Sequence, residues 1–149
     1  MEDVMAQCAT TYSETYVTKM TGRQIITMLE QIADNLFDPD PYRQSGGDMV
    51  RVGGLNYRIA PKNPLNQRIT DTRLDNGKAL VAKQVYQVAG WAVVGRVPEG
   101  RLIWDIVRDY ILHTKDENQV LQISKMNHPT LVGVTDNPGL ADYAGQLID

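Results

Sequence analysis

The sequence is poor in the side chains from which most catalytic and metal sites are built. It contains a single cysteine, Cys8, so no disulfide bond can form within the chain. Its two histidines, His113 and His128, do not form a metal-ligating pair, and no serine lies in a nucleophile-elbow motif. The Gly46 and Gly53 pairs do not open a helix, as phosphate-binding and dinucleotide-binding loops require. We therefore expect no complete catalytic set and no metal site made by this chain alone.

Strong charge of one sign and long apolar runs are also absent. The 149 residues carry 15 Lys and Arg against 18 Asp and Glu, a formal net charge of −3, which argues against a nucleic-acid partner. No apolar run has the length of a membrane span and no signal peptide begins the chain, so we expect no membrane partner. A hydrophobic fraction of 42% is typical of a globular domain. The start at residues 1–4 is typical of the interior of a longer protein.

Two segments have the spacing of amphipathic helices. In the first, Thr21 and Gln24 fit a capping box. The apolar stripe that follows contains Ile25, Met28, Leu29, Ile32, Ala33 and Leu36. This pattern predicts a helix over about residues 22–36, ended by the Asp-Pro-Asp-Pro run behind it. A second stripe contains Ile103, Ile106, Val107, Tyr110 and Ile111, and it predicts a helix over about residues 102–114.

The remaining apolar segments have the composition of strands. They lie at residues 15–18, near 49–59, at 68–74 and at 79–94. Asn76-Gly77 favours a type I′ hairpin turn, so we expect the last two strands to pair in antiparallel fashion. Periodicity is lost from residue 116 onward, which indicates a tail across the surface. The sequence thus predicts an α+β domain over residues 1–115, with a mixed or antiparallel sheet and flanking helices, followed by a tail over 116–149.

The most informative segment contains two glycine pairs. Gly46-Gly47 and Gly53-Gly54 bracket an acid, a thioether and an arginine, where glycine would weaken a strand, so we expect another surface to approach the backbone here. The fixed donor fork of Arg51 suits an anion, and the alternative is a bulged strand with Arg51 in solvent. Trp91 suits a binding site or a strand core, and we favour the core. The residues expected at a binding site are Gly46, Gly47, Asp48, Met49, Arg51 and Trp91.

Several motifs resemble a known family. The strand and capped helix of Thr15–Glu30, the strand Arg51–Leu55 and the strand Tyr86–Ala89 are similar to the C-terminal domain of 5′-nucleotidases, over roughly residues 1–112. Within that family the chain more closely resembles the SoxB branch, the thiosulfohydrolases. The motifs similar to that branch are Asp34–Tyr42, Gly46–Arg51, Ala89–Ala92, Ile103–Asp105 and Asn137–Gly139.

The resemblance implies a fragment of a dimanganese hydrolase of the periplasm. An N-terminal metallophosphatase domain would hold the two manganese ions, and the whole enzyme would hydrolyse sulfonate, as sulfate, from a cysteine S-sulfonate on the SoxYZ carrier. This chain would recognise the substrate and would be inactive alone. Its glycine segment would admit the glycine-rich arm of the carrier, because glycine lets two backbones approach closely. Arg51 would attract the anionic S-sulfonate or brace Asp48.

Two other functions remain open at this point. The chain is also similar to nucleoside-binding C-terminal domains of 5′-nucleotidases, which act in nucleotide catabolism. Those domains stack a base between two aromatic rings, whereas the first of these positions corresponds to Met49 here, and the Gly-Gly-Asp-Gly motif that follows the second is absent. A stand-alone module that binds the carrier without a metal-containing partner is the third hypothesis.

Overall fold

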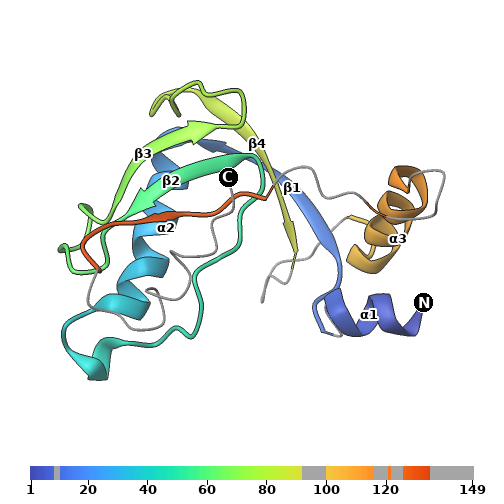
Figure 1. The fold of residues 1–149 in the computed structure, drawn as a ribbon, viewed down its shortest axis with the longest axis horizontal. Coiled ribbons are helices and arrows are strands. Elements are labelled where there is room, and N and C mark those ends of the chain that lie inside the picture. The colour runs from blue at the N-terminus through green and yellow to red at the C-terminus, as the bar shows by residue number, and fades with distance from the viewer. Residues whose placement is uncertain (9–10, 92–99, 116–120, 122–125, 135–149) are drawn as a thin grey trace. The chain divides into compact units, whose positions relative to one another are not determined.

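A computed structural model describes residues 1–8, 11–91, 100–115, 121 and 126–134 (Figure 1). The chain divides into two compact units. The first combines residues 1–20 with 85–125, and the second combines residues 21–84 with 126–149. Both contain helices and paired strands, which confirms the predicted α+β class. None of the helices in the described ranges is long and apolar enough to cross a membrane.

The second unit is built on one long helix. Helix α2 spans Gly22–Phe37 and begins with the predicted capping box. The Thr21 hydroxyl accepts from the backbone N–H of Gln24 at 3.3 Å, and the Gln24 side chain accepts from the backbone N–H of Thr21 at 2.8 Å. Two of the donors that a helix N-terminus leaves without partners are thereby satisfied. The prediction of this helix is confirmed to within one residue.

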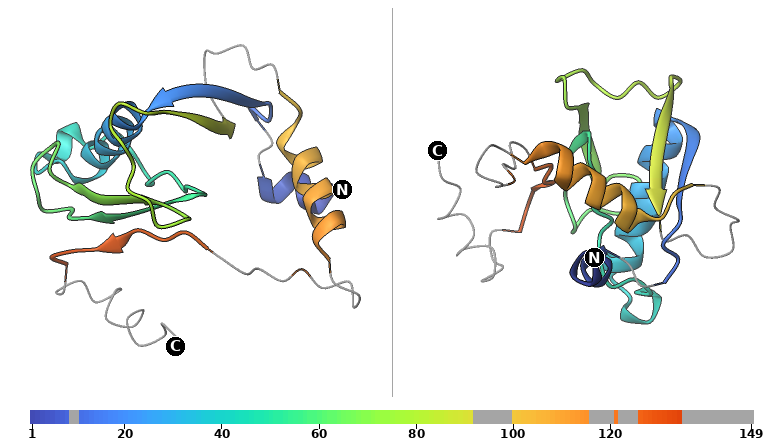
Figure 2. Two further views of the ribbon diagram at one scale, coloured as in Figure 1. Left: turned by 90° about the horizontal axis from the view of Figure 1, so that it is seen from above. Right: turned by 90° about the vertical axis from the view of Figure 1, so that its right-hand side faces the viewer.

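A three-stranded sheet lies against α2 in the second unit (Figures 1 and 2). Its strands are β2 (Leu55–Ile59), β3 (Ile69–Leu74) and β5 (Thr130–Leu131), in the order β3-β2-β5. Strand β2 pairs with β3 in antiparallel fashion and with β5 in parallel fashion. Apolar residues alternate with polar ones along β2, so one sheet face is buried. The core of this unit consists of Ile25, Leu29, Ala33, Leu55, Tyr57, Ile59, Ile69 and Leu80.

The strand bounds differ from two predictions. The strand expected near 49–59 begins only at Leu55, because Gly54 has φ +80°, a left-handed conformation that interrupts an extended chain. The strand expected over 79–94 is β4 (Val85–Trp91), and residues 92–94 lie outside the described ranges. Residues 79–84 instead form a short bridge to β3 and a turn. The division into a domain over 1–115 and a tail over 116–149 stays a prediction, although the described part of that tail contributes β5.

The turn after β3 is also of a different type from the one predicted. The Gly77 backbone N–H donates to the Leu74 carbonyl at 2.9 Å, and Gly77 has φ +80° while Asn76 keeps a negative φ. A type I′ turn needs a positive φ at both central residues. The loop is therefore a type I turn followed by a left-handed glycine. The expected antiparallel pairing of the two strands is present only as one isolated bridge, with Arg73 opposite Ala79, because β4 belongs to a different sheet from β3.

Two charged residues are buried where α2 meets the start of β3. The Arg68 side chain is 2% exposed and donates to the Asp34 carboxylate at 2.6 Å. It also donates to the carbonyls of Phe37, at 3.2 Å, and Pro61, at 3.3 Å. The Glu30 carboxylate accepts from the backbone N–H groups of Asn66 and Ile69, at 2.9 and 2.7 Å. Each buried charge thus has a full set of partners, as burial requires.

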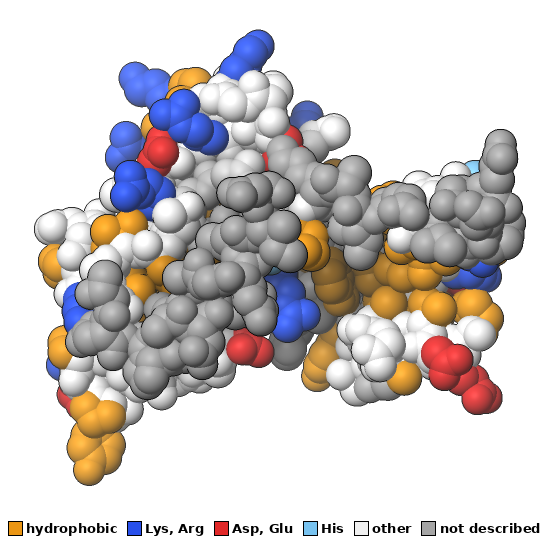
Figure 3. Space-filling view, viewed as in Figure 1, with side chains coloured by type: hydrophobic (Ala, Val, Ile, Leu, Met, Phe, Trp, Pro, Cys, Tyr) orange, Lys and Arg blue, Asp and Glu red, His pale blue; other side chains and the backbone are white. Residues whose placement is uncertain are grey.

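The first unit contains little apolar core among its described residues. Its elements are α1 (Glu2–Cys8), β1 (Thr15–Thr21), β4 (Val85–Trp91) and α3 (Ile103–Thr114), with β1 and β4 paired. Helix α3 confirms the second predicted helix, and β1 the first predicted strand. Ile103 is the only buried hydrophobic residue among those described in this unit. Apolar side chains instead gather at the surface over α1 and α3 (Figure 3).

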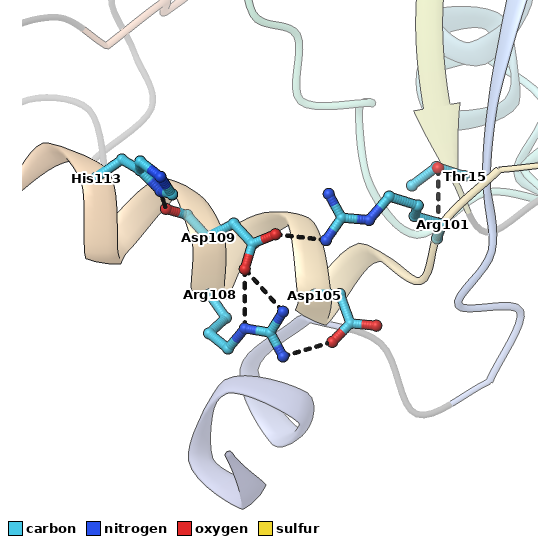
Figure 4. Close-up of polar contacts among 6 residues, drawn as sticks. All are labelled: Thr15, Arg101, Asp105, Arg108, Asp109 and His113. Atoms are coloured by element: carbon cyan, nitrogen blue, oxygen red, sulfur yellow. Dashed lines mark hydrogen bonds and ion pairs between the residues drawn. The ribbon is translucent and has the colours of Figure 1, made fainter.

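Charged side chains along α3 pair with one another (Figure 4). Arg101, which lies before the helix, donates to Asp109 Oδ2. Arg108 donates to Asp109 Oδ1, at 2.7 Å from Nη2, and to Asp105 at 3.0 Å. The hydrogen bond from Arg101, followed by that from Arg108, lowers the pKa of the Asp109 carboxyl below its usual value. These contacts tie the segment before α3 to the middle of the helix.

The packing of the N-terminus of α2 predicts a large effect of one methyl group. A Cβ at Gly22 would lie 2.9 Å from the carbonyl carbon of Val81 and closer still to its oxygen. Because backbone atoms cannot move aside as a side-chain tip can, Gly22→Ala should lower the free energy of unfolding by about 2 kcal/mol. Gly47→Ala is the control, since nothing lies within 4 Å of a Cβ there. Urea denaturation measures both, and equal effects would contradict the close approach.

The buried arginine predicts a second effect on stability. Arg68→Met should lower the free energy of unfolding by about 3 kcal/mol, because it leaves Asp34 and two carbonyls without their donor. Arg73→Met removes an arginine of the same strand segment whose side chain is 53% exposed and whose partner Asp71 is 46% exposed. That exposed pair should contribute no more than about 1 kcal/mol. Equal decreases in the free energy of unfolding for the two variants would show that the buried contacts of Arg68 contribute no more than an exposed ion pair.

The charge cluster on α3 predicts a titration. The folded-state pKa of Asp109 lies below the usual value near 3.8, so its stabilising contribution is present above that pH and is lost as pH falls through the folded-state pKa. Arg101→Met should raise the Asp109 pKa, because it removes the largest cause of the lowering. Carboxyl chemical shifts followed between pH 2 and pH 6 measure this, and Arg23→Met is a control away from the cluster. An unchanged Asp109 pKa would disprove the assignment.

Candidate functional site

A hydrogen-bonded turn at the end of α2 leads into the predicted site. The Asp38 carboxylate accepts from the Asp40 backbone N–H at 2.8 Å, and the Asp40 carboxylate accepts from the Tyr42 N–H at 3.0 Å. These aspartates shape the short 3₁₀ helix η1 (Pro41–Arg43), a structure that such Asx turns favour. The Gln44 side chain closes the turn by donating to the Asp38 carbonyl at 2.8 Å. Tyr42 projects from this turn with 98% of its surface exposed.

The Gly46–Gly54 loop starts where the chain returns to α2. The Gly46 N–H donates to the Asn35 carbonyl, in the last turn of the helix, at 3.2 Å. A Cβ at Gly46 would lie 3.2 Å from the Asn35 Cβ, which is a tight contact. The prediction that another surface approaches these glycines is therefore confirmed at Gly46, where that surface is the end of α2 in the same chain. At Gly47 and Gly53, no described atom lies within 4 Å of a Cβ position.

The middle of this loop presents its polar side chains to solvent. Asp48 and Arg51 are exposed and Met49 is half-buried. Within the described residues, no hydrogen bond or ion pair engages Asp48 or Arg51, so Arg51 does not brace Asp48 there. The alternative of a bulged strand with Arg51 in solvent is half right, because Arg51 is exposed on a loop and not on a strand. A guanidinium without a protein partner can accept an anion.

The loop ends at a second anchor. The Gly54 carbonyl accepts from the Asp75 backbone N–H at 3.2 Å, and the Gly54 N–H donates to the Asn127 side-chain oxygen at 3.1 Å. Asn127 also donates to Asn56 at 3.0 Å and to Asp75 at 2.7 Å. Sequence reasoning missed this cluster, because residue 75 falls in the predicted hairpin connection and residue 127 in the predicted tail over 116–149. No local pattern connects residues so far apart in the sequence.

Trp91 lies outside this arrangement. It ends β4 in the first unit, whereas the Gly46–Gly54 loop belongs to the second. Its side chain is 46% exposed, so the favoured prediction that it fills a strand core is wrong. Alternation along β4 explains the exposure, because Trp91 shares a face with the exposed residues Val85, Gln87 and Ala89. Its role in binding stays a prediction.

The described residues offer no metal centre. They contain no group of three or more His, Cys, Asp and Glu side chains placed to hold an ion. His113 lies in the last turn of α3, as predicted, with its Nδ1 at 2.6 Å from the Asp109 carbonyl. Cys8 is half-buried and free. The Gly46–Gly54 loop offers an exposed guanidinium at Arg51 and open space beside Gly47 and Gly53.

Comparison with known proteins places the chain in a family. The family model of the 5′-nucleotidase C-terminal domain matches residues 1–96. The sulfate thiohydrolase SoxB of Thermus thermophilus, solved in complex with glycerol, shares 29% sequence identity and has a TM-score of 0.69. That match covers 83% of this chain and 23% of the SoxB chain. No curated protein shows significant sequence similarity to the chain.

A second solved structure has the same fold. It is a Staphylococcus aureus protein described as a 5′-nucleotidase, in complex with α-ketoglutarate, with 16% identity and a TM-score of 0.63. The match covers 88% of this chain and 29% of that protein, so the chain spans less than a third of either solved neighbour. Because the family model matches well over half of its residues, the chain belongs to the 5′-nucleotidase C-terminal domain family.

Proposed function

We propose that the chain is the substrate-recognition part of a SoxB-type enzyme. In this proposal the whole enzyme removes the sulfonate group of a cysteine S-sulfonate on the SoxYZ carrier by adding water to its sulfur. The new bond joins the water oxygen to the sulfonate sulfur, and the S–S bond to the cysteine breaks. The carrier keeps its cysteine sulfur as a thiol, and sulfate and a proton leave. The chain's similarity to SoxB over 83% of its length supports this assignment. The isolated chain would have no activity.

The observation that carries the proposal is the open middle of the Gly46–Gly54 loop. Arg51 is exposed and has no partner among the described residues, so its charge is available to an anionic sulfonate. Gly47 and Gly53 have space where a side chain would lie, so packing within the described chain does not require glycine at either position. A narrow peptide arm that passes close to the backbone would require it. Asp48 and Met49 would border the same passage.

A preceding metallophosphatase domain would provide the metal chemistry. In this proposal it holds two manganese ions, and the enzyme acts in the periplasm. The described residues of this chain supply no cluster of ligands for those ions. The contribution of the chain is therefore to bind and orient the carrier arm. Trp91 would contribute a second contact surface, because its exposed ring offers a large apolar area.

Substitution of Arg51 in the enzyme that contains both domains tests this proposal. Arg51→Gln should lower kcat/KM for the carrier-bound S-sulfonate by about 10- to 100-fold, the range expected when a hydrogen bond to a charged group is lost. Arg58→Gln is the matched control, because Arg58 is also exposed but lies on β2 outside the loop. Gly47→Ala should lower kcat/KM while leaving the urea midpoint unchanged.

Other results would support a different function. Equal kcat/KM values for Arg51→Gln and Arg58→Gln would exclude Arg51 from the site. Saturable chemical-shift changes on addition of adenosine to the chain would favour a nucleoside-binding domain of a 5′-nucleotidase. An upstream reading frame without a metallophosphatase segment would favour a stand-alone carrier-binding module.

A further inference from the structure

The exit of the Gly46–Gly54 loop is held by a cluster of four residues from three separate segments. Gly54 ends the loop, Asn56 lies on β2, Asp75 lies in the turn after β3, and Asn127 lies just before β5. Five hydrogen bonds connect them, at distances between 2.7 and 3.2 Å. We call this group the Asn127 cluster. It joins the later part of the chain to the proposed recognition loop.

The side-chain amide of Asn127 suits this position because it can accept and donate at once. Its oxygen accepts from the Gly54 backbone N–H, while its nitrogen donates to the oxygens of both Asn56 and Asp75. Asn56 also donates to the same Asp75 oxygen, at 3.1 Å. An aspartate at 127 would keep the acceptor but would place a second carboxylate against Asp75. A serine or alanine would be too short to connect all three groups.

The cluster acts on the loop through Gly54. No backbone hydrogen bond anchors residues 47–53 to the rest of the described second unit, so the two ends of the loop set its course. At the first end, Gly46 is bound to the Asn35 carbonyl of α2. At the second end, Gly54 is held at φ +80° by contacts to Asp75 and Asn127. Loss of the Asn127 contact would free one of the two ends.

We propose that Asn127 is a positioning residue, through which the segment 126–134 sets the conformation of the Gly46–Gly54 loop. Strand β5 fixes the position of this segment, because Val132 donates to the Ile59 carbonyl at 2.8 Å and Thr130 pairs with Arg58. The segment therefore does more than cover the sheet edge. Its effect on the loop stands independently of the ligand, whereas its effect on turnover rests on the proposed function.

Amide hydrogen exchange in the labelled chain tests the conformational part. Asn127→Asp should raise the exchange rate of the Gly54 amide about tenfold or more, and should shift the amide signals of Gly47 and Gly53, because repulsion from Asp75 would move the new carboxylate away from the Gly54 N–H. Asn76→Asp is the matched control. It makes the same charge change next to Asp75, but the Asn76 oxygen that accepts from the Lys78 N–H is retained.

A reciprocal exchange provides the rescue. The double variant Asp75→Asn with Asn127→Asp restores one amide–carboxylate pair at unchanged net charge, so it should recover most of the Gly54 protection. Asn127→Ala tests the contact without added charge and should also deprotect Gly54. Unchanged Gly54 exchange in both single variants, or the same change in Asn76→Asp, would overturn the proposal.

Turnover by the enzyme that contains both domains tests the functional part. Asn127→Asp should raise KM for the carrier-bound S-sulfonate about 3- to 10-fold with little change in kcat, as expected when the ground state and transition state lose binding equally. The double variant should restore KM. Loop signals that shift without any change in KM would retain the positioning role of Asn127 and reject the role of the loop in substrate recognition.

Discussion

The buried guanidinium of Arg68 is the contact on which the second unit depends. It binds Asp34 and the Phe37 carbonyl, both in the last turn of α2, and thereby places a cation at the C-terminal end of the helix dipole. The same side chain donates to the Pro61 carbonyl in the connection between β2 and β3. Helix, connection and strand are thus held by one group, which only arginine's fork of donors can do. Glu30 completes the junction by capping two backbone N–H groups.

The candidate site is built outward from this junction. Asp34, which Arg68 holds, also accepts through its carbonyl from the Asp38 N–H at 3.0 Å, where α2 ends and the turn towards Tyr42 begins. Asn35, the next residue, supplies the carbonyl that binds Gly46. The first end of the Gly46–Gly54 loop is therefore bound to the same helical turn that Arg68 contacts. A binding loop is positioned more precisely when its ends are attached to a regular secondary-structure element.

The sequence predicts those parts of the fold that depend on local periodicity. The capping box of Thr21 and Gln24 and the stripe behind it determine α2, and the same pattern determines α3. Burial of Glu30 and Arg68 could not be read in this way, because charged residues are ordinarily exposed and all their partners except Pro61 lie more than 30 residues away. The conformation of Gly54 and the contacts of Asn127 are equally non-local. The prediction that Trp91 fills a strand core rested on its apolar neighbours. It is wrong because Trp91 lies on the exposed face of β4, which its neighbours in sequence do not reveal.

The structure explains some of the glycines by the fold alone and leaves others without such an explanation. At Gly22 the backbone of Val81 excludes any side chain, and at Gly54 the left-handed φ favours glycine, so the fold itself explains both. At Gly47 and Gly53 neither explanation applies, because both have open space and an ordinary φ. A flexible residue that the fold does not need costs conformational entropy on folding. In the proposed function that cost is offset by the close passage of a substrate arm, which makes these two glycines, more than Gly46 or Gly54, the ones whose role lies outside the fold.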